Sequence, residues 1–175
     1  MEKITSVDLL KKIRDRESTN IRVREGKVKP EPSGFSKYIL VCGGTGCHAS
    51  QSKQILENLK AEVEKNNLTD KIQVLPTGCF GFCEKGPIVS IMPDGVFYVS
   101  VTPADAEAII GEHIIQGKKV ERLMFVEPLT QQKIDKREEI PFYKKQIRIA
   151  LRNCGLLDPE NINEYIAENG YQALA

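Results

Sequence analysis

The sequence has no tryptophan, and its other aromatic residues are few: five tyrosines and six phenylalanines among 175 residues. A nucleic-acid surface built from stacked aromatic side chains is therefore not expected. No apolar run approaches the roughly 18 residues that a membrane-spanning helix needs, so we expect no membrane insertion. Met1-Glu2-Lys3 leads into a charged segment without the apolar core of a secretory signal. The expected location is therefore cytoplasmic.

The chain also has almost no net charge, because 25 Lys and Arg nearly balance 24 Asp and Glu. This balance gives no general attraction to nucleic acid or to anionic membranes. The hydrophobic share of 41% is that of an ordinary globular protein. In the cytoplasm, the five cysteines are expected to be thiols, metal ligands or redox groups rather than structural disulfides.

The charge is distributed unevenly, and this indicates how the chain is organised. Residues 1–34 carry a net charge of +3, and we predict an N-terminal helix and linker there. Residues 35–117 carry −3, contain no arginine and are predicted to form the folded domain. Residues 118–140 are polar and are predicted to be a second linker. Residues 141–175 are predicted to form a helical segment.

Outside the central domain, three helices are predicted. Apolar residues at three-residue steps predict a helix over 5–17, and the Gly and Pro residues of 18–36 predict a linker after it. A helix is predicted from Phe142 to Asn153. Another is predicted from Asp158-Pro159 to Gly170, because Asp followed by Pro is typical of a helix start.

Within the central domain, the pattern alternates between strands and helices. The predicted strands are 38–41, 72–75, 88–91 and 96–101, and the predicted helices are 50–66 and 102–117, the last with Thr102 as its N-cap. A helix joins the first two strands, which must be parallel, and a tight turn joins the last two, which must be antiparallel. The predicted fold class is α/β, a four-stranded mixed sheet with flanking helices, as in thioredoxin-like domains.

Four cysteines stand in two pairs, Cys42 with Cys47 and Cys79 with Cys83, spaced C-x4-C and C-x3-C. The first pair follows the first predicted strand, and the second pair follows the second strand. Because these strands are parallel, both loops leave the sheet at its carboxyl end, where ligands gather in open α/β sheets. The topology therefore predicts that the four thiols converge.

Four thiolates are the ligand set of a [2Fe–2S] cluster, and six glycines in or beside the two loops allow backbone N–H groups to approach its sulfides. The glycines are Gly43, Gly44, Gly46, Gly78, Gly81 and Gly86. Phe80 and Phe82 are placed to exclude water. Two alternatives stay open: a structural zinc site, and inert or redox-switching thiols. Zinc knuckles favour C-x2-C and dithiol switches C-x-x-C, and neither spacing occurs.

Other candidate residues carry weaker signals. Residues 44–49 match the dinucleotide pattern G-x-G-x-x-A, but no acidic residue follows the second strand to hold a ribose. His48 is interpreted as an exposed or capping residue rather than a ligand. His113 is interpreted as a packed helix residue, and Cys154 as a free structural thiol. We expect no catalytic residues.

Two segments carry a family resemblance: Val41 to Cys47 and Thr77 to Pro87 resemble the thioredoxin-like [2Fe–2S] ferredoxin family. The tail from Glu139 to Gly155, with Glu164-Tyr165-Ile166 and Gly170-Tyr171, looks like the entry to the flavoprotein subunit of NADH dehydrogenases. Together they are similar to the N-terminal part of the beta subunit of NAD(P)-reducing and electron-bifurcating [FeFe]-hydrogenases. Related formate dehydrogenase subunits share this layout.

The resemblance implies that Cys42, Cys47, Cys79 and Cys83 bind the iron of a [2Fe–2S] cluster that transfers one electron at a time. It also implies that residues 141–175 begin a flavin- and NAD(P)H-binding domain, so that FMN, the nicotinamide and the hydride chemistry of an oxidoreductase belong to a part of the subunit not contained here. The implied partners are a small [2Fe–2S] subunit and an [FeFe]-hydrogenase catalytic subunit. The alternatives are a free-standing [2Fe–2S] ferredoxin and a non-redox thioredoxin-like scaffold with zinc or free thiols.

Overall fold

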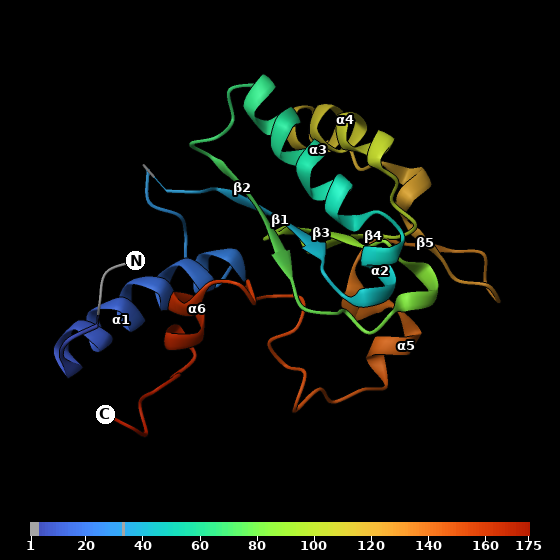
Figure 1. Cartoon of the computed structure of the whole chain (residues 1–175). Helices are drawn as coiled ribbons and strands as arrows, with labels where there is room; N and C mark the ends of the chain where they lie inside the picture. Colours follow the sequence, from blue (N-terminus) through green and yellow to red (C-terminus); the bar gives the residue numbers. More distant parts are fainter. Residues whose placement is uncertain (1–3, 33) are drawn as a thin grey trace.

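A computed structural model describes residues 4–32 and 34–175 of the chain (Figure 1). Its centre is a four-stranded sheet in the order β2-β1-β3-β4. The strands are β1 (Lys37–Cys42), β2 (Ile72–Thr77), β3 (Val89–Met92) and β4 (Val96–Tyr98). β1 pairs with β2 in parallel and with β3 antiparallel, and β3 pairs antiparallel with β4. The predicted mixed sheet is confirmed.

Both faces of the sheet are buried. Alternate residues of β1 point to opposite faces, and each set belongs to its own core. Ile39 and Val41 belong to a core shared with α3 (Ser52–Lys65) and the helix after β4. Tyr38, Leu40 and Cys42 belong to a second core on the other face. Figure 1 shows α3 and α4 (Ala106–Ala108) above the sheet and α1 (Val7–Arg24), α5 (Pro141–Lys144) and α6 (Ile162–Ala167) below it.

The helix after β4 begins as predicted, with Thr102 as its N-cap and Pro103 in its first turn. The Asp105 carboxylate accepts hydrogen bonds from the backbone N–H and the hydroxyl of Thr102, both at 2.7 Å, so the helix start is a capping box. The helix passes from a 3₁₀ turn through α4 into a π-helical stretch, Ile109–Ile115. No described helix is both long and apolar enough to cross a membrane.

The N-terminal helix is longer than predicted. α1 continues through Arg24, so the first part of the predicted linker over 18–36 is helical. Ile21, Val23 and Arg24 are buried, and this tertiary packing stabilises a stretch whose sequence alone gives only weak helical periodicity. α1 packs against α6, where Leu10 and Ile13 contact Ile166.

Residues 118–140 are polar in sequence, yet they are ordered against the sheet. They contain a small antiparallel pair, β5 (Phe125–Val126) and β6 (Lys133–Ile134). Val120, Leu123, Phe125 and Ile140 are buried. The backbone N–H of Phe97 donates to Asp135 O, and that of Val99 donates to Leu123 O, so this segment covers the outer side of β4.

The helix predicted from Phe142 to Asn153 is wrong over most of its length. Only α5, Pro141–Lys144, is helical, and the chain then runs irregularly to α6. Ile147, Ala150 and Leu151, which helical spacing would place on one apolar face with Tyr143, are exposed. α6 itself is shorter than the predicted 158–170 helix, because Asn161 rather than Asp158 is its N-cap. The chain is held here by contacts with the sheet, described below, rather than by helical hydrogen bonds.

Candidate functional site

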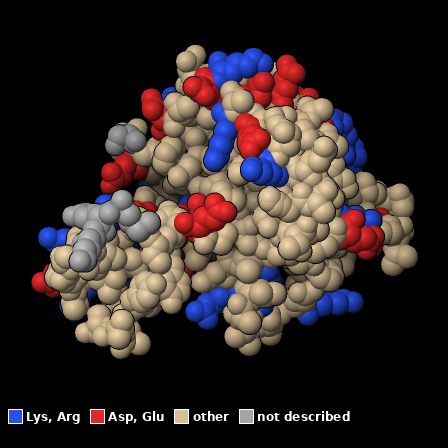
Figure 2. Space-filling view, in the orientation of Figure 1, with Lys and Arg blue, Asp and Glu red and all other residues tan. Residues whose placement is uncertain are grey.

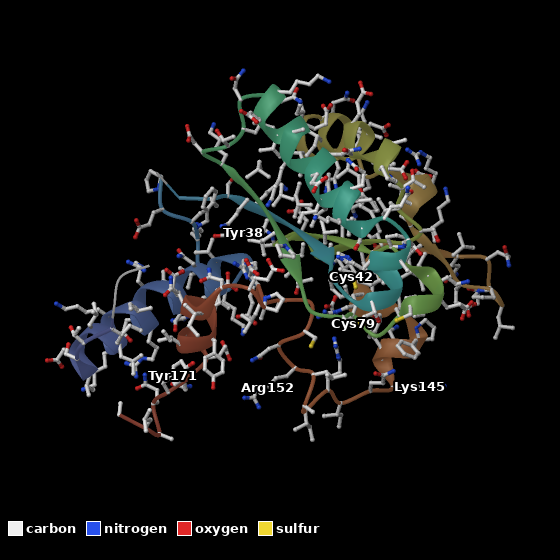
Figure 3. The ribbon with its side chains drawn as sticks, viewed as in Figure 1. Tyr38, Cys42, Cys79, Lys145, Arg152 and Tyr171 are labelled. Atoms are coloured by element: carbon white, nitrogen blue, oxygen red, sulfur yellow. The ribbon has the colours of Figure 1, made fainter. Side chains whose placement is uncertain are left out.

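The two cysteine loops meet at the carboxyl end of the sheet. Cys42 is the last residue of β1, and the parallel register places it opposite Thr77, the last residue of β2. The backbone N–H of Gly43 donates to Thr77 O at 2.8 Å, which joins the beginnings of both loops. Cys47 lies on α2 (Thr45–Ala49), immediately after the first loop. The predicted convergence of the two loops is therefore present in the structure (Figure 3).

Several short distances bring the cysteines of the two loops close together. Cys79 Sγ lies 3.9 Å from Cys83 Sγ. A Cβ atom added at Gly44 would lie 3.0 Å from Cys79 Sγ and 3.6 Å from Cys42 Sγ. One added at Gly86 would lie 2.7 Å from Cys47 Sγ, closer than real Cβ atoms approach other atoms. Glycine at both positions thus leaves space that the sulfur atoms require.

The proton affinities of the thiols are unequal. A hydrogen bond from the Cys47 thiol lowers the pKa of Cys42 to about 6, and backbone N–H groups of Phe80 and Gly44 act in the same direction against the effect of burial. The same hydrogen bond, together with burial, raises the pKa of Cys47. Burial also raises the pKa of Cys79, although the Gly81 N–H donates to its sulfur at 3.3 Å. Hydrogen-bond donors, among them backbone N–H groups, are therefore directed at the sulfur atoms of Cys42 and Cys79.

The site is closed on one side and open on the other. Cys42 and Cys47 are each 1% exposed, whereas Cys79 is partly exposed and Cys83 is exposed. Phe80 is buried and packs edge-on against Phe97 at 5.2 Å. Phe82 is half-buried and stacks on Phe142 with ring centroids 5.2 Å apart. The two phenylalanines expected to exclude water are thus packed beside the cysteines.

Two kinds of metal centre use four cysteine thiolates as ligands, a structural zinc ion and a [2Fe–2S] cluster. A structural zinc ion needs four ligands that converge on one point. A [2Fe–2S] cluster instead needs two thiolates at each of two irons and hydrogen-bond donors toward its sulfurs. Two adjoining pairs of thiols with backbone N–H donors meet that requirement.

The remaining candidates take other places. His48 is exposed, as interpreted from the sequence. His113 is buried and is hydrogen-bonded through Nδ1 to the Tyr98 hydroxyl at 2.8 Å, so it belongs to the core. Cys154 is a free thiol, but it lies against Gly78, where an added Cβ would be 3.1 Å from its sulfur, and not at a helix end. The glycines of the dinucleotide-like pattern adjoin the second cysteine loop instead of an open phosphate site.

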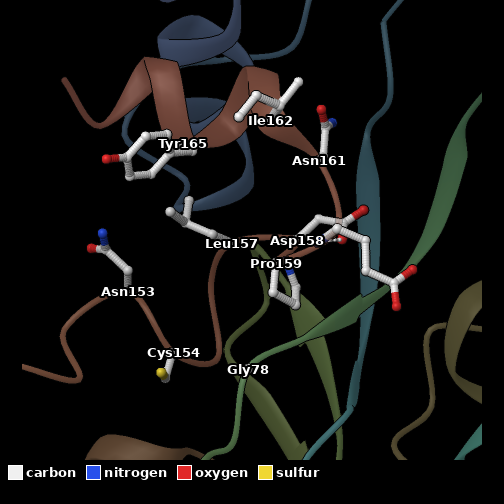
Figure 4. A pocket seen from close by; sticks show the side chains of 10 residues that line it. Gly78, Asn153, Cys154, Leu157, Asp158, Pro159, Asn161, Ile162 and Tyr165 are labelled. Atoms are coloured by element: carbon white, nitrogen blue, oxygen red, sulfur yellow. Dashed lines mark hydrogen bonds between the residues drawn. The ribbon is translucent and has the colours of Figure 1, made fainter. Parts of the chain in front are cut away.

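A shallow pocket of about 450 Å³ lies beside the site (Figure 4). It is lined by Gly78, Asn153, Cys154, Leu157, Asp158, Pro159, Glu160, Asn161, Ile162 and Tyr165. Gly78 precedes the first cysteine of the second loop, but none of the four paired cysteines lines the pocket. The pocket is therefore a neighbour of the cysteine site and not a part of it.

Sequence reasoning missed a group of residues that contact the second cysteine loop from the C-terminal part of the chain. The Tyr143 hydroxyl donates to Phe80 O at 3.1 Å. The Thr77 hydroxyl donates to Leu157 O at 2.8 Å and accepts from the Gly155 N–H at 3.1 Å. No local sequence pattern identifies these partners, because each pair lies more than sixty positions apart.

Comparisons with known proteins agree with this geometry. A family described as thioredoxin-like [2Fe–2S] ferredoxin matches residues 28–113. A 2Fe–2S ferredoxin from Clostridium pasteurianum is 42% identical over 77 residues, which are 44% of this chain and 76% of that protein. A 2Fe–2S ferredoxin from Aquifex aeolicus is 33% identical over 79 residues, 45% of this chain and 71% of that protein.

Two further similarities extend the comparison. The crystal structure of the wild-type thioredoxin-like [2Fe–2S] ferredoxin from Aquifex aeolicus shares 31% identity and a TM-score of 0.47, over 51% of this chain and 95% of that one. A short stretch of 32 residues is 66% identical to the NADP-reducing hydrogenase subunit HndC of Solidesulfovibrio fructosivorans. That stretch is 18% of this chain and 6% of HndC.

Proposed function

Since this chain belongs to the thioredoxin-like [2Fe–2S] ferredoxin family, we propose that its four paired cysteines hold the [2Fe–2S] cluster through which it transfers single electrons. The proposed ligands are Cys42, Cys47, Cys79 and Cys83. The observation that carries this assignment is the meeting of both cysteine loops at the carboxyl end of β1 and β2. A bound cluster supplies one-electron chemistry, because its irons change charge without a covalent change in the protein.

The protein's own contribution is to orient the thiols and to limit the access of water. The Gly81 N–H donates to Cys79 Sγ at 3.3 Å and thereby stabilises negative charge on sulfur. Phe80 and the buried Cys42 and Cys47 keep one side dry. Electrons would enter and leave on the other side, where Cys83 is exposed.

The first test is iron and acid-labile sulfide per chain on anaerobically purified protein, followed by an EPR spectrum after reduction with dithionite. We expect two irons, two sulfides and the signal of one unpaired electron. One zinc per chain, or thiols without iron, would contradict the proposal and leave a scaffold domain.

The ligand assignment is tested residue by residue. Cys42→Ser, Cys47→Ser, Cys79→Ser and Cys83→Ser should each lower the iron content or change the EPR signal, because a ligand is lost. Cys154→Ser is the matched control, since Cys154 is a free thiol beside the same loop. Equal effects of Cys154→Ser and Cys83→Ser would contradict the assignment.

We further propose that the electron transfer serves an NAD(P)H-linked hydrogenase or dehydrogenase complex in the cytoplasm. The short similarity to HndC supports the hydrogenase context. Five free cysteines suit a reducing compartment. In this proposal residues 35–117 are the electron-transfer domain, FMN and NAD(P)H bind to a domain that residues 141–175 begin, and hydride chemistry takes place there.

This wider proposal needs its own test. The protein is purified anaerobically from its native cells with an affinity tag, and the preparation is exposed to hydrogen gas or to NADPH. Reduction of the cluster by either compound, seen as the EPR signal, is expected for a complex of this class. A chain that purifies alone and is reduced by neither compound would favour a free-standing ferredoxin.

A further inference from the structure

Residues 140–157, here called the covering segment, lie across the second cysteine loop. The Tyr143 hydroxyl donates a hydrogen bond to Phe80 O. The Thr77 hydroxyl accepts a hydrogen bond from the Gly155 N–H and donates one to Leu157 O. A Cβ atom added at Gly155 would lie 2.5 Å from the Phe80 ring, so the backbone of the segment rests directly on the loop. The covering segment is thus in contact with the loop on both sides of Cys79.

Arg148 is the charged residue of the covering segment that reaches this loop. Its Nη2 lies 3.5 Å from Cys79 O, and its Nη1 donates to Cys154 O at 3.3 Å. The guanidinium therefore lies between two carbonyl groups, one of them belonging to a proposed cluster ligand. Of the charged groups in residues 4–32 and 34–175, no carboxylate lies within 4 Å of Arg148, although most other arginines have such a partner.

The surroundings of Arg148 leave its charge uncompensated. The covering segment contains Lys144, Lys145, Arg148 and Arg152 and no acidic residue. Figure 2 shows Lys and Arg side chains along the lower edge of the molecule, where Figure 3 labels Lys145 and Arg152 on the outer side of the segment. Arg152 is exposed, whereas Arg148 is half-buried.

The buried phenol of Tyr143 lies within the field of both groups. Burial raises the pKa of Tyr143 to about 12, the positive charges of Arg137 and Arg148 lower it, and the thiols Cys42 and Cys79 raise it. The charge of Arg148 and the sulfur atoms therefore act on one common neighbour, the buried phenol of Tyr143, around which charges are screened less than in water.

On the basis of the proposed function, we propose that Arg148 raises the reduction potential of the cluster from the Cys79 side. Reduction adds one negative charge to the site. A fixed positive charge nearby stabilises the reduced form more than the oxidised form, so the site becomes easier to reduce. Arg148 is a positioning residue: its charge and its contact with Cys79 O act on the ligand loop, and it is not itself a ligand.

The covering segment does not depend on Arg148 for its place. The hydrogen bonds of Thr77 and Tyr143 hold the segment at two points. Near the end of the segment, the Arg24 guanidinium donates a hydrogen bond to Leu156 O at 2.6 Å. Replacement of Arg148 should therefore leave the segment on the loop, which separates an electrostatic effect from a loss of structure.

The experiment is a potentiometric titration of the full chain with its cluster, using dithionite, redox mediators and the EPR signal. Arg148→Gln removes the charge and keeps hydrogen-bonding capacity, while Arg148→Lys keeps the charge. Arg152→Gln is the matched control, because it removes the same charge from an exposed position of the same segment. Iron and sulfide contents establish that each variant carries the cluster.

We expect Arg148→Gln to shift the midpoint to more negative potential, lowering the ratio of reduced to oxidised protein at a fixed potential by roughly threefold to tenfold. Arg148→Lys should retain most of the original midpoint. Arg152→Gln should shift it less, and high salt should reduce that shift further, because exposed charges are screened.

Two results would overturn the inference. Equal midpoints for Arg148→Gln and Arg152→Gln would show that the place of Arg148 has no special effect. Equal shifts for Arg148→Gln and Arg148→Lys would show that its charge is not the cause. Absence of iron and sulfide from the unsubstituted chain would contradict the proposed function, and this inference with it, so the two failures are distinguishable.

Discussion

The guanidinium of Arg24 donates two hydrogen bonds of 2.8 Å to the two carboxylate oxygens of Glu164, which lies 140 positions later in the chain. Both side chains are almost entirely buried, and the guanidinium also lies 5.0 Å from the centre of the Tyr38 ring. The pair therefore joins α1, α6 and the sheet in one place.

Arg24→Met should destabilise the protein strongly, because it leaves the Glu164 carboxylate buried without its partner. Removal of one member of a buried ion pair costs about 3–5 kcal/mol. The measurement is the free energy of unfolding in urea. Lys27→Met is the control, since Lys27 pairs with Glu25 at an exposed position and should matter little. Similar losses in both variants would contradict this account of the pair.

Gly86→Ala should impair cluster binding. Its added methyl group would lie 2.7 Å from Cys47 Sγ, so the sulfur or the loop must move. We expect fewer than two irons per chain. Gly111→Ala is the control, because an added Cβ there meets no atom within 4 Å and alanine is favoured over glycine in a helix. Full iron content in Gly86→Ala would show that the loop has room for the methyl group.

Asp94→Asn should remove part of the acid sensitivity of the fold. A hydrogen bond from His113, and then the pairing with Lys37, lower the pKa of Asp94 to about 2 against the effect of burial. Because the folded pKa lies below the unfolded value, the carboxylate stabilises the fold above about pH 4. This stabilisation is lost as the pH falls toward 2 and is at most about 2 kcal/mol.

The measurement for Asp94 is the thermal midpoint of both proteins between pH 7 and pH 2.5. Because both proteins carry the same cysteines, acid loss of the cluster affects them alike, and the difference between their midpoints isolates Asp94. Asp94→Asn should be less stable at pH 7, with the difference shrinking at low pH. A constant difference at every pH would be evidence against a role of the ionised carboxylate.

Thr77→Val should loosen the covering segment while keeping the shape of the side chain. Leu157 O and the Gly155 N–H would lose their partner, at a cost of about 1–3 kcal/mol. Limited trypsin digestion should then cut faster at Lys144, Lys145 and Arg148. Thr130→Val is the control, since Thr130 is exposed and its hydroxyl contacts Glu127 and Gln132 within its own surface turn, away from the covering segment. Unchanged digestion would mean that Thr77 does not hold the segment.

The sheet and the meeting of the cysteine loops could be predicted because both depend on local patterns. Short apolar runs define the strands, and the connections between them fix which strands are parallel. Once β1 and β2 are parallel, Cys42 and Cys79 must follow strand ends on the same side of the sheet. The predicted N-cap Thr102 is also a local feature, and the structure confirms it.

The C-terminal part could not be predicted, because its conformation depends on distant partners. Residues 142–153 have apolar residues at helical spacing, which favoured a helix. In the structure Tyr143 instead belongs to the second core, on the face of the sheet with Tyr38 and Leu40. Further along, the backbone N–H of Gly155 donates a hydrogen bond to the Thr77 hydroxyl. The C-terminal half of α1 escaped prediction for the same reason, since the buried Arg24 is paired there with the distant Glu164. Such pairings have no signal in a single sequence.

Residues 118–140 cover the outer side of β4, and this has a consequence for shortened forms of the protein. β4 is an edge strand of the sheet, and the outward N–H groups of Phe97 in β4 and of Val99 just after it donate hydrogen bonds to Asp135 O and Leu123 O. A chain that ended at Gly117 would keep every cysteine of the two loops but leave these groups unpaired beside an apolar strand. Unprotected strands of this kind are templates for intermolecular pairing. A shortened form that keeps this edge of the sheet paired therefore extends through residue 135, well past the last cysteine of the second loop.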